Sequence, residues 1–85
     1  MTKTGPHRIQ RGPMAGLTVT AEAYRLPSGD WAVDLIGEPW DGRSLPARHT
    51  YCFRNCMEAY AQVKLFAEAG AEMAEGPYTP PVLAY

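Results

Sequence analysis

The sequence has few of the features that direct a protein to a membrane or out of the cell. Its 85 residues include only two cysteines, Cys52 and Cys56, too few for a disulfide framework and compatible with a reducing compartment. No apolar run reaches the roughly 18 residues that a membrane-spanning helix needs. Residues 1–16 also lack the apolar stretch of about 7–15 residues that marks a secretory signal. We therefore expect a cytoplasmic protein that does not enter the membrane.

The residue patterns of common catalytic sites are also missing. The sequence has no glycine-rich phosphate loop, and neither Ser28 nor Ser44 stands in a Gly-x-Ser-x-Gly motif. Glu68 and Glu72 are one helical turn apart, but they fall on the predicted solvent-facing side of a helix. A solvated pair lacks the desolvation or charged partner that acid–base catalysis requires. We expect a protein that is not an enzyme and uses no cofactor.

Three potential zinc ligands lie close together in the sequence. His49, Cys52 and Cys56 have the spacing His-x2-Cys-x3-Cys, but a structural zinc site needs a fourth ligand. The only other histidine, His7, belongs to the N-terminal segment. Alternation along a strand also directs His49 and Cys52 to opposite faces. We predict no metal site.

Chain-breaking residues are concentrated at the two ends of the sequence. Residues 1–16 contain two Gly-Pro pairs among basic and polar residues, and this density predicts a flexible basic arm. Residues 76–85 contain three further prolines, which predict an extended Pro-rich tail. The folded domain is therefore expected over residues 17–75.

Three segments of this domain alternate apolar and polar side chains with the period of two that is typical of strands. They are residues 17–26, 31–36 and 47–53. The intervening Pro27-Ser28-Gly29-Asp30 has the chemistry of a hairpin turn. Residues 37–46 are rich in proline and glycine and predict a loop.

Residues 55–75 predict a helix of about five turns, because they are rich in alanine and contain no proline. Asn55 is a favoured N-cap, and Glu58 can complete a capping box with it. Leu65 falls on the polar face of this helix, in solvent. The apolar residues converge on the other face: Cys56, Ala59, Tyr60, Val63, Phe66, Ala67, Gly70 and Ala74.

The order of these elements predicts an α+β fold. We expect a three-stranded antiparallel β-meander packed against one C-terminal α-helix, with the flexible arm before it and the Pro-rich tail after it. A chain of this size removes only about 60% of its unfolded surface from water, so the core is expected to be one sheet layer against one helix.

Acidic and basic residues nearly cancel, with eight Lys and Arg against nine Asp and Glu, but they are separated into blocks. The net charges of successive blocks are +3 for residues 1–25, −4 for 26–42, +3 for 43–54 and −3 for 55–85. No acidic residue lies between Arg43, Arg48 and Arg54, so a basic edge of the sheet is one interpretation. Ordinary solvated charges are the other.

Large apolar side chains are expected at exposed positions. Trp40, Tyr78 and Tyr85 fall in predicted loop and tail segments, and Trp and Tyr dominate the hot spots of protein interfaces. Together with Leu65 they indicate a surface that binds a protein partner. Alternatively, the tail folds back and its apolar residues cover the open face of the sheet or the helix.

Two sequence patterns resemble a known family. The first pattern is Ser28-Gly29-Asp30-Trp31-Ala32-Val33. A loop follows it, and the second pattern is Phe53-Arg54-Asn55-Cys56-Met57-Glu58-Ala59. Over residues 17–74 this order resembles the integrase arm-type, AP2-like DNA-binding domains, which have three strands and a helix. HicB-like antitoxins share a similar order of elements.

The resemblance implies DNA binding through the sheet, with contacts carried by Arg25, Arg43, Arg48 and Arg54. The sequence departs from the family pattern because Asn55 replaces the usual threonine, the third strand has fewer basic residues, and no recombinase domain follows. The excess of acidic residues also disfavours phosphate binding.

Two functional hypotheses follow. The first is a small non-enzymatic protein-binding module, an inhibitor or adaptor of mobile-element or phage type and anti-CRISPR-like in class, with Trp40, Leu65, Tyr78 and Tyr85 as anchors. The alternative is a DNA-binding module that uses the sheet face and the four arginines.

Overall fold

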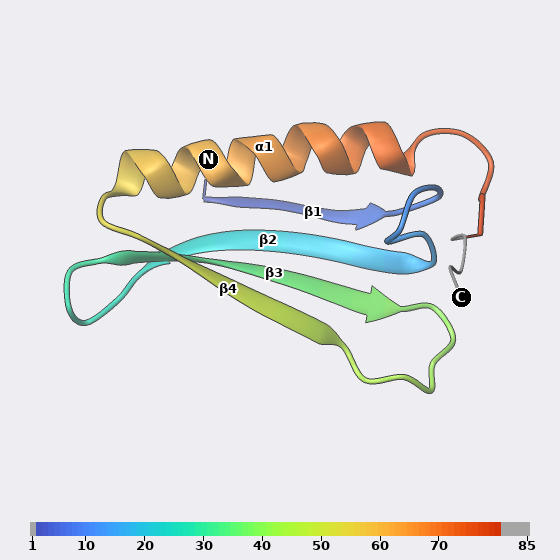
Figure 1. Ribbon diagram of the computed structural model, residues 1–85, viewed down its shortest axis with the longest axis horizontal. Helices are drawn as coiled ribbons and strands as arrows, with labels where there is room; N and C mark the ends of the chain where they lie inside the picture. Colours follow the sequence, from blue (N-terminus) through green and yellow to red (C-terminus); the bar gives the residue numbers. More distant parts are fainter. Residues whose placement is uncertain (1, 81–85) are drawn as a thin grey trace.

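The computed structural model describes residues 2–80 as one antiparallel sheet of four strands with a single helix packed on one face (Figure 1). The strands are hydrogen-bonded in their order along the chain. The elements are β1 (Lys3–Arg8), β2 (Leu17–Arg25), β3 (Trp31–Pro39), β4 (Ala47–Phe53) and α1 (Cys56–Ala74). The predicted α+β class is confirmed, whereas the prediction of three strands is wrong because the sheet has four.

The additional strand, β1, lies where the sequence predicts a flexible arm. Thr4 and His7 both pair with β2, and the register shifts between these two residues. The shift interrupts the alternation of side chains, so the period of two is not visible in the sequence of this strand. The prediction of a flexible arm is therefore wrong for residues 3–8, which form one edge of the sheet.

The helix also holds this N-terminal segment. Gly70 of α1 lies so close to β1 that a Cβ at this position would stand 2.7 Å from Cδ2 of His7. The backbone N–H of Gln10 donates a hydrogen bond to the carbonyl of Met73 at 2.8 Å. These contacts join residues that are distant in the sequence, so local patterns do not reveal them.

The three strands predicted from alternation are confirmed as β2, β3 and β4. The loop predicted over residues 37–46 is wrong for residues 37–39, which extend β3 because they pair with the first residues of β2. β2 and β3 are joined by a tight turn, in which Gly29 takes a φ of +94° that side-chain-bearing residues rarely adopt. Ala23, Val33 and Tyr51 lie opposite one another across the three strands and therefore share a face of the sheet. This is the face against which α1 packs.

The helix begins and faces the sheet as its sequence predicts. Oδ1 of Asn55 accepts a hydrogen bond from the backbone N–H of Glu58 at 2.9 Å, which confirms Asn55 as the N-cap. Ala59, Val63 and Gly70 are the buried residues of α1. They lie on the side that the spacing of apolar residues indicates.

The core between the two layers is built largely from small side chains. Ala21, Ala23 and Ala59 are buried there, and the largest fully buried side chains of the protein's described residues are Ile9, Val33 and Val63. Small residues let the helix lie close to the sheet, while larger apolar residues surround this centre. The surrounding residues are Trp31, Leu35, Tyr51, Phe53, Tyr60 and Phe66.

The helix does not cover the sheet evenly. It packs mainly against β1 and β2 and least against β4. Figure 1 shows β4 diverging from α1 toward the end of the strand at Ala47. The described residues place no element over the opposite face of the sheet. Within residues 2–80, no helix is long and apolar enough to cross a membrane.

Candidate functional site

The outward face of α1 presents large apolar side chains to solvent. Leu65, which the sequence places in solvent, is 58% exposed, and Met57 in the first turn is 79% exposed. Ala61 lies between them along the helix and is also exposed. At about 100° per residue these positions fall within roughly 80° of the helix surface, and Met57 and Leu65 are about 12 Å apart along its axis. We call Met57, Ala61 and Leu65 the helix stripe.

The same side of the helix becomes acidic beyond the helix stripe. Glu68, Glu72 and Glu75 are all exposed in the last two turns and just after them. The described part of α1 has a single basic residue, Lys64. The outward surface of α1 therefore joins an apolar half to a negatively charged half.

Trp40 and Tyr78 lie together, but away from the helix stripe. The indole N–H of Trp40 donates a hydrogen bond to Oγ1 of Thr18 at 2.9 Å. The guanidinium carbon of Arg8 lies 4.3 Å from the centre of the Trp40 ring, and the ring of Tyr78 lies 5.5 Å from it. These contacts leave Trp40 half-buried, where the sequence predicts an exposed side chain.

Of the three predicted anchors within residues 2–80, Leu65 is the most exposed and Trp40 and Tyr78 lie against each other. Tyr78 is 47% exposed, and one side of its ring is covered by Trp40. Tyr85 lies outside the residues that the structure describes. The alternative in which the tail covers the open face also concerns residues 81–85 and lies outside them.

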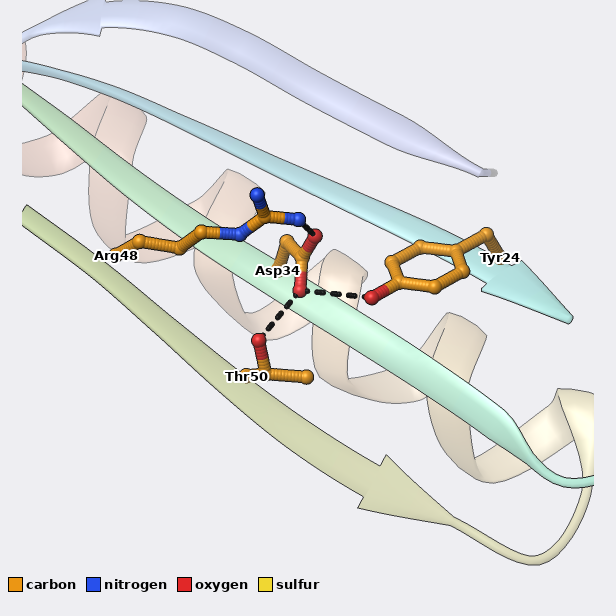
Figure 2. A network of polar contacts seen from close by, with 4 residues as sticks. All are labelled: Tyr24, Asp34, Arg48 and Thr50. Atoms are coloured by element: carbon orange, nitrogen blue, oxygen red, sulfur yellow. Dashed lines mark hydrogen bonds and ion pairs between the residues drawn. The ribbon is translucent and has the colours of Figure 1, made fainter. Parts of the chain in front are cut away.

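The uncovered face of the sheet contains a buried carboxylate (Figure 2). Asp34, in the middle of β3, is only 5% exposed. It accepts hydrogen bonds from the hydroxyl of Thr50 at 2.7 Å and from that of Tyr24 at 3.1 Å, and it forms an ion pair with Arg48. Figure 2 shows these side chains converging on Asp34 from β2 and β4.

This network determines the charge state of its members. Burial alone would raise the pKa of Asp34, but the hydrogen bonds from Thr50, Arg48 and Tyr24 and the charge of Arg48 outweigh burial and hold the pKa below its ordinary value. Burial and the neighbouring carboxylate raise the pKa of Tyr24. Asp34 is therefore a charged group on β3 that is stabilised by a hydroxyl from β2 and by a hydroxyl and a guanidinium from β4. An already satisfied carboxylate of this kind joins strands and is poorly suited to acid–base chemistry.

The four arginines of the DNA-binding hypothesis are not brought together. Arg25 ends β2 and Arg54 follows β4, so both lie at one end of the sheet. Arg43 lies in the loop at the other end, and Arg48 lies between the two ends with its charge directed to Asp34. Binding to duplex DNA depends on clustered cations that neutralise neighbouring phosphates. The positions of these arginines do not favour a DNA-binding surface.

Sequence reasoning missed two features of these surfaces. Met57 has the helical spacing that places it on the same side of α1 as Leu65, so the helical wheel could have identified it. Asp34 could have been singled out as the one carboxylate in the apolar strand of residues 31–36. Its partners, however, depend on the register of three strands, which the sequence does not determine.

The remaining chemistry of the described residues is limited. Residues 2–80 contain no group of three or more His, Cys, Asp or Glu side chains that could hold a metal ion. His49 and Cys52 lie on opposite faces of β4, as alternation predicts. Comparison of the chain with protein-family models, with curated proteins and with solved structures finds no match.

Proposed function

We propose that this protein is a small non-enzymatic module that binds a partner protein through the outward face of α1. The observation that carries the proposal is the helix stripe, two large apolar side chains exposed two turns apart on one side of a well-formed helix. Exposed apolar residues that occur singly need no explanation, whereas anchors repeated along one helix face are the pattern by which a helix enters an apolar groove.

The charges on α1 indicate the chemistry of the partner. The acidic residues beyond the helix stripe favour a groove that is apolar at one end and lined by Lys or Arg at the other. Charges at the rim of an interface act mainly on the rate of association. Binding is therefore expected to become slower as salt is added, while the apolar contacts determine how long the complex lasts.

The proposal is tested by comparing two exposed leucines. Leu65→Glu places a charge in the helix stripe, and Leu45→Glu makes the same change at a leucine that is 87% exposed in the loop before β4. Each variant and the wild type are used to capture proteins from a native lysate, followed by quantitative mass spectrometry. We expect a set of proteins that the wild type and Leu45→Glu retain and Leu65→Glu loses.

Each other result contradicts the proposal. If both variants capture the same proteins as the wild type, or if none captures a protein above background, the helix stripe is not a binding site. If only Leu45→Glu loses its partners, the contact lies in the loop. A role as an inhibitor or adaptor of mobile-element or phage type stays a prediction from the sequence, which the identity of the captured proteins would test.

A further inference from the structure

β4 is an edge strand whose outer side has no neighbour among the described residues. The strand pairs only with β3, over seven consecutive residue pairs without a register shift. Ala47, Arg48, His49, Thr50 and Cys52 are all exposed. Such an edge presents a row of backbone N–H and C=O groups that another strand can pair with. Proline and bulges, which usually prevent such pairing, do not occur in this strand.

An apolar hollow of about 150 Å³ lies beside the first residues of this edge. Leu35 and Gly37 line it from β3, and Ala47, Arg48 and His49 line it from β4. Met14 and Leu17 close it on the side of β2. A strand that pairs with β4 would place alternate side chains on this side of the sheet, next to Ala47 and His49.

The last residues of β4 have the side chains that suit this hollow. Tyr51 and Phe53 point to the helix side of the sheet, and Cys52 points to the other side. In an antiparallel pair of β4 strands centred on Thr50, Phe53 of one copy lies opposite Ala47 of the other, and Tyr51 lies opposite His49. Both rings are half-buried against the core of their own copy, and their exposed sides then lie beside the hollow of the other.

Charge disfavours two of the symmetric alternatives to this register, and the hollow disfavours a third, because centring on His49 would place Phe53 beyond Ala47 and outside the paired residues. Centring the pair on Arg48 would place the two Arg48 side chains opposite each other, and centring it on Tyr51 would place Arg48 opposite Arg54. Like charges directly opposite in a sheet are destabilising. Centring on Thr50 places Arg48 opposite the neutral Cys52 and separates the two Arg48 residues by about 13 Å, beyond the screening length of about 8 Å. The ion pair with Asp34 offsets each Arg48 further.

We propose that two copies of this chain associate through β4, antiparallel and centred on Thr50. The two sheets then form one continuous sheet of eight strands, four from each copy. The two-fold axis is perpendicular to this sheet, so both α1 helices lie on the same side. The interface uses residues distant from the helix stripe, and the dimer therefore stands or falls separately from the proposed function.

The test uses three substitutions at one exposed position. Cys52→Arg places an arginine opposite Arg48 of the other copy, Cys52→Glu places a carboxylate there, and Cys52→Ser is the neutral control. Sedimentation equilibrium under reducing conditions, from about 1 μM to 1 mM, gives the dissociation constant of the dimer. Because the contact occurs twice by symmetry, we expect Cys52→Arg to weaken the dimer about tenfold and Cys52→Glu to strengthen it by a similar factor.

Cys52→Ser is expected to associate like the wild type, because the proposed contact is not a disulfide. A wild-type protein that stays monomeric at the highest concentration overturns the proposal. So does a dimer whose dissociation constant responds equally to Cys52→Arg and Cys52→Glu, since that result places the contact elsewhere. Circular dichroism of each variant confirms that the measured change arises from association and not from loss of the fold.

Discussion

The two edges of the sheet are built in different ways. β1 contains Pro6, shifts its register within six residues, and is held by the last turns of the helix. β4 is regular, has no proline, and has the fewest contacts with the helix. Proline, bulges and a covering helix are the devices by which proteins prevent edge-to-edge pairing. Their presence on one edge and absence from the other marks β4 as the edge where another strand can add.

Gly70→Val is expected to have the largest effect, because it disturbs the contact between the helix and β1, the protected edge. The new side chain meets the ring of His7, which is held by a hydrogen bond of 2.8 Å to Oγ1 of Thr4. Overpacking of this kind is expected to lower the free energy of unfolding by about 3 kcal/mol. Urea denaturation measures the loss, and hydrogen exchange should show faster exchange of the β1 amides than of the β3 amides.

The matched control is Ala69→Val, one residue away on the exposed side of α1. It introduces the same β-branched side chain into α1 without a contact to β1, and it should lower the free energy of unfolding by only about 0.5 kcal/mol. Equal losses for the two variants would show that the helix, and not its contact with β1, is what valine disturbs.

Thr50→Val acts on the unprotected edge and has a smaller effect. It removes one hydrogen bond to the buried carboxylate of Asp34, which is expected to cost about 1.5 kcal/mol at neutral pH. The folded pKa of Asp34 lies below its unfolded value, so its contribution to stability is present above the unfolded pKa and is lost as pH falls through the folded one. With a donor removed, the folded pKa of Asp34 rises toward its unfolded value, so the stability lost in acid should be smaller and the loss should end at a higher pH.

Urea denaturation from pH 7 downward and carbon-13 titration of the Asp34 carboxyl group measure the two parts of this prediction. Thr20→Val serves as the control, because Thr20 lies in β2 on the same face of the sheet as Thr50. An acid limb of the same depth that ends at the same pH in Thr50→Val and in the wild type would show that Thr50 does not hold the charge of Asp34.

Lys3→Glu is expected to have the smallest effect and sharpens the comparison of the edges. Lys3 is exposed at the start of β1 and lies opposite Glu22 of β2, so a glutamate there is expected to lower the free energy of unfolding by only about 0.5 kcal/mol. If the β1 edge takes no part in association, sedimentation equilibrium should give the wild-type dissociation constant. A change as large as that expected for Cys52→Arg would place a contact on β1 and remove the distinction between the edges.

Much of the fold could be predicted from the sequence because three strands and the helix have strong local periodicity. The strand over residues 47–53 and the Asn55 cap were predicted as the structure has them. β1 could not be predicted, because its register shift removes the period and its stability depends on β2 and the last turns of α1. Sequence patterns of this kind reflect interactions between residues that are close in the chain, whereas β1 is stabilised by residues that are far from it in the chain.

The candidate surfaces were predicted less completely. The exposure of Leu65 could be predicted from the helical wheel, which places this apolar residue on the polar, solvent-facing side of the helix. Trp40 was expected in solvent, but Arg8, Thr18 and Tyr78 meet at its ring. The hollow beside β4 could not be predicted, because it depends on how far the sheet twists away from the helix. No residue type in the sequence indicates that divergence.

The buried carboxylate of Asp34 also acts as a lock on strand alignment. If β4 slipped by one residue, Thr50 and Arg48 would turn to the other face, and a slip by two residues would replace the hydroxyl opposite Asp34 by a thiol or a guanidinium. A slip by one residue, or a slip by two that brings Cys52 opposite Asp34, would leave the carboxylate without the hydroxyl of Thr50 that it accepts a hydrogen bond from. A bare edge strand is the part of a sheet most free to slide, and here one aspartate in the adjacent strand keeps it in place.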